Sequence, residues 1–219
     1  MQFDSEEIKP SAIDLLVFVD DTGHETFAGN QGFYGLGSCL AMGWGYEHLK
    51  AKWREVRMAI NGDPDAPLHA SDITAFAALR AFFEGRYFFR VAATTTKSVE
   101  LPPGMHPCVP VMGQLVVEIE ALARLVRCER IWIILESSER ADPVVKGHFG
   151  KLTSIDAVQT LPVEHRLMAK SANEPGLEVA DFIVSAASSE VQRHLRGKLG
   201  HAPDFHDVFC RLSRAGCRY

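Results

Sequence analysis

The sequence lacks paired cysteines, an excess of positive charge and a long apolar run. None of its five cysteines, Cys39, Cys108, Cys128, Cys210 and Cys217, belongs to a C-x-x-C pair, so the sequence indicates neither a disulfide framework nor a zinc knuckle. Scattered thiols of this kind are typical of a reducing compartment. With 23 lysines and arginines against 28 acidic residues, the formal net charge is −5. That balance argues against a protein that coats nucleic acid through an overall positive field.

No segment reaches the roughly 18 uninterrupted apolar residues of a membrane span. The first residues, M-Q-F-D-S-E-E, carry acids where a secretory signal carries basic and then apolar residues. We therefore expect a cytoplasmic protein that does not enter a membrane. The 219 residues are 47% hydrophobic, enough to bury a core without a metal or disulfide. We expect one domain over residues 1–219, in which any metal serves chemistry.

Hydrophobic periodicity predicts alternating strands and helices. A short apolar strand over 13–19 stops at Asp20-Asp21-Thr22-Gly23, which suits a turn. Further strands are expected over 32–42, 87–96 and 131–135, with an edge strand near 158–163. Helices are expected over 46–60, from Ser71 or Asp72 to about Glu84, over 111–128 and over 175–195, with 101–110 as a connection. This order predicts an α/β domain.

Carboxylates follow two of the predicted buried strands. Asp20 and Asp21 follow the first and point to opposite faces by the two-residue alternation, so only one can face a shared site. Glu136 follows the strand over 131–135 in the same way. Open α/β sheets place their sites at such strand ends. An ordinary turn at Asp20 and a solvated strand end at Glu136 would explain the same residues.

The last predicted helix carries two more acids. Asp181 lies only about 60° from the centre of the apolar stripe, and a carboxylate there needs a hydrogen bond, an ion pair or a cation. Glu178 lies three residues earlier on the adjoining surface, so both could address one site. A capping or ion-paired acid is the alternative. The stripe consists of Leu177, Ala180, Val184, Ala187, Val191 and Leu195.

His69 and Asp72, in P-L-H-A-S-D, form another polar pair near a predicted helix start. A histidine can carry protons near neutral pH, whereas a surface histidine and a helix-capping aspartate are the simpler interpretation. Acids at two strand ends and on a late helix are the oxygen donors that magnesium or manganese takes. Such ions make the local electrostatic potential positive, so that a negatively charged phosphate can bind. Further positive contacts could come from Arg90, Lys97, Arg140, Lys146, Lys151 and Lys170.

Four segments resemble a known family in the same order along the chain. L-L-V-F-V-D-D-T-G resembles the F-I-D-E-S-G opening of the bacterial family called domain of unknown function 3800, and P-L-H-A-S-D resembles its His-x-x-Asp segment. I-W-I-I-L-E resembles its central acidic strand end, and G-L-E-V-A-D-F-I its closing Q-x-A-D-L helix. The matches run from Asp20 to Ile183, about three quarters of the chain.

The resemblance implies a ribonuclease H-like fold, with a mixed central sheet flanked by helices. Asp21, Thr22 and Glu178 stand where the family usually has Glu, Ser and Gln, which leaves the roles of Asp21 and Glu178 open. The acidic-site role falls on Asp20, His69, Asp72, Glu136 and Asp181.

Our leading hypothesis is a metal-dependent phosphodiester hydrolase with nucleic acid as a possible partner. Asp20, Glu136 and Asp181 would be the primary ligands of magnesium or manganese, with Glu178 as a further candidate. A noncatalytic module that binds nucleic acid or protein on the same fold is the main alternative. An aspartic protease using Asp21-Thr22-Gly23 is a third hypothesis; it would need a homodimer, because the chain has no second D-T-G or D-S-G.

Overall fold

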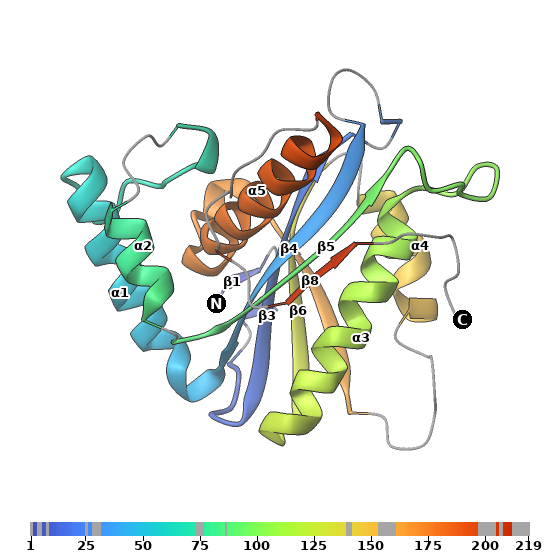
Figure 1. Ribbon diagram of the computed structural model, residues 1–219. Coiled ribbons are helices and arrows are strands. Elements are labelled where there is room, and N and C mark those ends of the chain that lie inside the picture. The colour runs from blue at the N-terminus through green and yellow to red at the C-terminus, as the bar shows by residue number, and fades with distance from the viewer. Residues whose placement is uncertain are drawn as a thin grey trace.

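The computed structural model describes residues 2–3, 6–7, 9–24, 26–27, 32–72, 77–85, 87–138, 142–152, 161–196, 205 and 208–211. Figure 1 shows a twisted sheet with helices on both of its faces. The strands of this sheet are β3 (Asp14–Gly23), β4 (Phe33–Met42), β5 (Phe89–Thr96), β6 (Arg130–Glu136), β7 (Val163–Met168) and β8 (Val208–Arg211). Two short strands, β1 (Gln2–Phe3) and β2 (Glu6–Glu7), pair with each other.

The strand order within the described sheet is β7-β6-β3-β4-β5-β8. β3, β4 and β5 form an antiparallel meander. β6 is parallel to β3, β7 is parallel to β6, and β8 is parallel to β5. A meander extended on its first strand by two parallel strands, with helices on both faces, is the ribonuclease H-like arrangement. The expected fold class is therefore confirmed, and β8 widens the sheet at the β5 edge.

Two layers of helices cover the sheet (Figure 1). α1 (Gly43–Asn61), α2 (Ala77–Glu84) and α5 (Pro175–Leu195) lie on one face, whereas α3 (Cys108–Val126) and α4 (Asp142–Leu152) lie on the other. Along β3, Leu16 and Phe18 belong to the core under α1 and α5, and Leu15 and Val17 to the core under α3. By the same alternation, Asp20 faces α5.

α5 lies unusually close to the sheet because glycines stand at its contacts. A Cβ added to Gly37 on β4 would lie 2.6 Å from the backbone nitrogen of Val184, and one added to Gly176 would lie 2.3 Å from the Phe18 ring. α5 begins where the sequence predicts, at Pro175, and the Glu174 side chain accepts a hydrogen bond from the Gly176 N–H at 3.3 Å. This close approach brings the acids of α5 to the strand ends.

The predicted turn at Asp20–Gly23 is wrong. β3 continues to Gly23, because β4 is long enough to pair with every residue from Asp20, opposite Gly37, to Gly23, opposite Tyr34. Backbone pairing thus overrides the local turn preference of Asp and Gly.

Other element boundaries also differ from the predictions. The described chain has a short 3-10 helix, η1 (Ala70–Asp72), and α2 begins only at Ala77, with 73–76 outside the described residues. The edge strand is β7, which starts at Val163 instead of ending there; residues 158–160 lie outside the described part. Three consecutive polar residues, Glu164, His165 and Arg166, form the middle of β7, so the apolar pattern of a strand is missing beyond Val163. α4 and β8 were not predicted.

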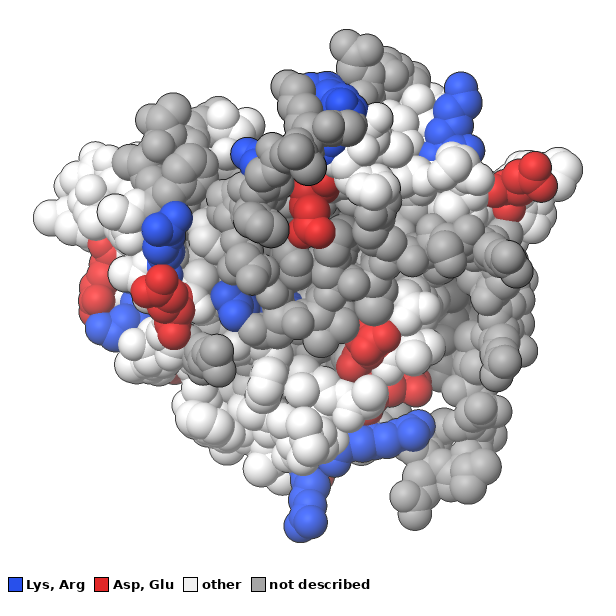
Figure 2. All heavy atoms as spheres, in the orientation of Figure 1, with Lys and Arg blue, Asp and Glu red and all other residues white. Residues whose placement is uncertain are grey.

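Among the described residues, no helix combines the length and the apolar character needed to cross a bilayer. On the face of the molecule in Figure 2, the described lysines and arginines lie in small separate groups among acidic residues. That view agrees with the absence of an overall positive field inferred from the net charge of −5.

Candidate functional site

Asp20 and Glu136 are 116 positions apart and stand side by side on the sheet. β3 and β6 are parallel neighbours, and their last matched pair is Val19 opposite Leu135. Asp20 and Glu136 are the next residue on each strand, so the register places both carboxylates at the same level. Parallel pairing of two buried apolar strands is thus what brings these two acids together.

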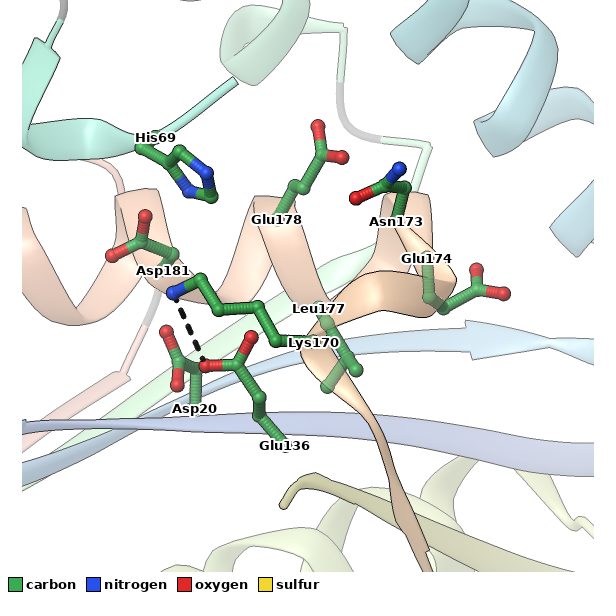
Figure 3. Close-up of a pocket in the computed structure, with 9 residues that line it drawn as sticks. All are labelled: Asp20, His69, Glu136, Lys170, Asn173, Glu174, Leu177, Glu178 and Asp181. Carbon is green, nitrogen blue, oxygen red and sulfur yellow. Dashed lines mark ion pairs between the residues drawn. The ribbon is translucent and has the colours of Figure 1, made fainter. Parts of the chain in front are cut away.

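α5 adds Asp181 to the same place. Asp20, Glu136 and Asp181 line one open pocket. In Figure 3 the carboxylates of Asp20 and Glu136 lie next to each other, and Asp181 stands above them on α5 with its carboxylate turned toward the His69 side. The structure therefore brings together the three residues that the sequence nominated as primary ligands. The other lining residues are His69, Lys170, Asn173, Glu174, Leu177 and Glu178.

The carboxyl groups of Asp20 and Asp181 are harder to ionise than usual. Burial raises the pKa of Asp20 well above its ordinary value, and the nearby charges of Glu136 and Asp181 raise it further. Burial likewise raises the pKa of Asp181, while the Ala70 N–H, Lys170 and His69 partly oppose that rise. Positive charge at this point would stabilise the ionised carboxylates.

Lys170 supplies one positive charge to the pocket. It opens the short 3-10 helix η2 (Lys170–Ala172) between β7 and α5, and its Nζ lies 3.6 Å from Glu136 Oε2 (Figure 3). Of the other basic residues suggested as positive contacts, Arg90 is buried and donates to the Phe83 carbonyl at 3.1 Å, which makes that suggestion wrong. Arg140 and the side chain of Lys151 lie outside the described residues.

His69 enters the pocket from the segment before η1. The backbone N–H groups on either side of it are held by α5: Leu68 donates to Glu178 Oε2 at 3.1 Å, and Ala70 donates to Asp181 Oδ2 at 2.9 Å. Two acids three residues apart on one helix thus fix the backbone that presents the His69 ring (Figure 3). Asp72 ends η1, and its side chain lies outside the described residues.

Glu178 is not available as a metal ligand in this arrangement, so that expectation is corrected. Its Oε1 lies 2.5 Å from Arg57 Nη2, and its Oε2 accepts hydrogen bonds from Arg57 Nε at 3.1 Å and from Trp53 Nε1 at 2.7 Å, besides the Leu68 N–H. The ion-paired alternative considered for the α5 acids applies to Glu178. Its physical cause is the buried guanidinium of Arg57, which needs a charged partner.

Sequence reasoning missed Arg57, Asn173 and Glu174. Arg57 follows Trp53 by four residues, so it falls on the buried face of α1, and that position was the available signal. Asn173 adopts a left-handed conformation with φ of 49°, and its carbonyl accepts from Arg57 Nη2 at 2.9 Å. Glu174 accepts a hydrogen bond from the Tyr46 hydroxyl, and burial raises the pKa of Glu174 to about 7.

Asp21 lies on the opposite face of the sheet from Asp20, as the alternation predicts. Burial raises the pKa of Tyr34, and the neighbouring Cys108 and the charge of Asp21 raise it further. Tyr34 and Cys108 belong to the core under α3. Asp21-Thr22-Gly23 is therefore part of strand β3 and lies apart from the carboxylate pocket, an arrangement that lends the aspartic protease hypothesis no support.

The donor set fits a hard divalent cation in kind, since Asp20, Glu136 and Asp181 all offer carboxylate oxygens. Within the described ranges, no three histidine, cysteine, aspartate or glutamate side chains are already placed in metal-holding positions. Asp181 Oδ2 is engaged by the Ala70 N–H, and Glu136 is paired with Lys170. A cation would therefore require these side chains to adjust.

No protein-family model and no curated protein matches the chain. Among solved structures, it is similar to Bst-RNase HIII in complex with Mn²⁺, at 12% identity and a TM-score of 0.41, with 86% of this chain and 57% of that one covered. It is also similar to a mutant protein of Bst-RNase HIII, at 11% identity and a TM-score of 0.39, covering 84% and 56%. The chain thus spans less than two thirds of the length of either structure.

Proposed function

We propose that this chain is a metal-dependent phosphodiester hydrolase in which Asp20, Glu136 and Asp181 hold magnesium or manganese. The observation that carries the proposal is the convergence of three carboxylates, from β3, β6 and α5, on one pocket. Burial and mutual repulsion raise the pKa of Asp20, which makes a cation the natural partner of the set.

A bound divalent cation would polarise a phosphoryl oxygen and neutralise the charge that develops during hydrolysis. The chain's own residues do the rest of the positioning. Asp20 and Glu136 are fixed by strand register, and Asp181 by the close packing of α5. His69, on a backbone clamped at both sides, is placed to move a proton in the pocket. Lys170 offers a positive charge to an anionic substrate.

Nucleic acid is the proposed substrate class, because divalent cations held in such sites stabilise the attacking and leaving oxygens when a phosphodiester is cleaved. Membership of the domain of unknown function 3800 family stays a prediction that the ordered sequence motifs support. The alternative of a noncatalytic binding module predicts cation or ligand binding without hydrolysis.

The proposal is tested by comparing hydrolysis by the unaltered chain with hydrolysis by Asp20→Asn and by Asp21→Asn. Release of product from RNA, DNA, RNA–DNA hybrid and bis(p-nitrophenyl) phosphate would be followed with and without Mn²⁺. We expect Mn²⁺-dependent cleavage of at least one of them, lowered at least about a hundredfold in Asp20→Asn. Asp21→Asn is the matched control, because it makes the same change on the other face of the sheet, and it should retain activity within a few-fold.

The proposal is wrong if cleavage does not depend on Mn²⁺ or if Asp20→Asn cleaves as fast as the unaltered protein. Mn²⁺ binding without any cleavage would favour the noncatalytic module. Cleavage of a peptide that is lost in Asp21→Asn and persists in chelator would restore the protease hypothesis.

A further inference from the structure

Lys170 places its ammonium group beside the acidic side chains of the pocket. Its Nζ is 3.6 Å from Glu136 Oε2, and Figure 3 shows its side chain extending across the pocket between Glu136 and Asp181. Its charge is also one of the influences that lower the pKa of Asp181. One ammonium group thus acts on two of the three carboxylates proposed to hold a cation.

The backbone of Lys170 is held firmly. In η2, the Ala172 N–H donates to the Ala169 carbonyl at 2.9 Å, and the Asn173 N–H donates to the Lys170 carbonyl at 3.1 Å. Arg57 secures the end of this turn by donating to the Asn173 carbonyl, and Arg57 is itself fixed by Glu178. The base of the Lys170 side chain therefore has a defined place beside the pocket.

The ammonium end of Lys170, by contrast, reaches the pocket from solvent. The Lys170 side chain is 63% exposed, whereas that of Glu136 is 21% exposed. An ion pair with one exposed partner is weak, on the order of 1 kcal/mol or less, and breaking it buries no charge. The side chain can therefore leave Glu136 without a large energetic cost.

An ammonium group and a divalent cation repel each other when both approach one carboxylate. We propose that Lys170 and a divalent cation exclude each other at Glu136: Lys170 balances the acids when no cation is bound, and it turns to the anionic substrate when one is. This inference rests on the proposed function. It adds that Lys170 weakens cation binding and strengthens substrate binding.

Calorimetric titration with Mn²⁺ alone tests the claim that Lys170 weakens cation binding. The proteins are the unaltered chain, Lys170→Met, Lys170→Arg and a control, Lys52→Met, which removes a lysine on α1 whose Nζ lies 2.8 Å from Glu55 Oε1. We expect Lys170→Met to bind Mn²⁺ about three- to tenfold more tightly. Lys170→Arg keeps the charge and should bind no more tightly than the unaltered chain, and Lys52→Met should match it. An unchanged or weaker affinity in Lys170→Met overturns the inference.

Steady-state kinetics with bis(p-nitrophenyl) phosphate at saturating Mn²⁺ test the claim that Lys170 strengthens substrate binding. We expect Lys170→Met to raise KM more than it lowers kcat, with KM restored toward its original value in Lys170→Arg; an unchanged KM overturns the substrate role. If none of the proteins binds Mn²⁺, the proposed function is wrong and the inference falls with it. If Lys170→Met tightens Mn²⁺ binding and no phosphodiester is cleaved, the hydrolase proposal alone fails.

Discussion

Arg57 and Glu178 form a buried ion pair, with Nη2 and Oε1 2.5 Å apart and side chains only 5% and 7% exposed. Arg57 belongs to α1 and Glu178 to α5, and each also binds a segment that borders the pocket. Glu178 accepts from the Leu68 N–H beside His69, and Arg57 donates to the Asn173 carbonyl at the end of the Lys170 turn. One ion pair therefore holds both the His69 and the Lys170 sides of the pocket.

Breaking this pair should destabilise the protein strongly. Glu178→Gln keeps the shape of the side chain and leaves the Arg57 charge buried without a charged partner, at an expected cost of about 3–5 kcal/mol in the free energy of unfolding. Arg54→Met is the matched control, because Arg54 and Asp65 form an exposed pair with Nη1 and Oδ1 2.6 Å apart. Loss of that pair should cost about 1 kcal/mol or less. Urea denaturation measures both, and equal losses would contradict the structural role of Glu178.

Replacing Gly37 should destabilise the protein, because α5 packs directly against this residue. In Gly37→Ala, the new Cβ would lie 2.6 Å from the Val184 nitrogen, so α5 must move away, at a cost of about 1–3 kcal/mol. Gly45→Ala is the control: its Cβ would meet nothing within 4 Å, and alanine favours the α1 helix by up to about 1 kcal/mol.

Thermal unfolding of the two glycine variants, together with Mn²⁺ titration of each, checks this expectation. Gly37→Ala should lower both Tm and Mn²⁺ affinity, since α5 carries Asp181. If Gly37→Ala unfolds at the same temperature as Gly45→Ala, α5 does not lie as close to β4 as described.

Glu174 should make stability depend on pH. Burial raises its pKa from the ordinary 4.5 to about 7 in the folded protein. Between these values the folded state holds a proton that the unfolded state releases. The free energy of unfolding therefore falls as pH rises from about 4.5 to about 7, with a contribution of about 3 kcal/mol.

Glu174→Gln removes this titration and keeps an oxygen to accept from Tyr46 and from the Gly176 N–H. Urea denaturation at pH 5 and pH 8 should show a smaller difference between the two pH values in Glu174→Gln than in the unaltered chain. Glu84→Gln, at an exposed position on α2, serves as the control and should leave the difference unchanged. The same difference in Glu174→Gln would show that Glu174 is not the titrating group.

The sequence allowed the central part of the site to be predicted because short-range rules control it. Two-residue alternation separates Asp20 from Asp21, and helical periodicity places Asp181 near the buried side of α5. Each of these acids interrupts an otherwise apolar pattern, which makes it visible. Parallel pairing of β3 and β6 then brings Glu136 beside Asp20.

The surrounding residues were not predictable, because they depend on contacts between distant segments. Nothing near Glu178 in the sequence indicates that Arg57, 121 positions away, is its partner. Likewise, Asp-Asp-Thr-Gly has the local preferences of a turn, and only the length of β4 makes it a strand. Lys170 was one of six basic residues proposed as positive contacts, and its place follows from the turn that Arg57 secures.

The most direct measurement of the central claim is the anomalous scattering of Mn²⁺ in crystals of the unaltered protein. The account predicts an ion bound by carboxylate oxygens of Asp20, Glu136 and Asp181, at the roughly 2.1 Å typical of small hard cations, with Lys170 Nζ moved away from Glu136. An ion bound elsewhere, or none at a Mn²⁺ concentration that saturates the protein in solution, would contradict the claim that these three acids form a cation site.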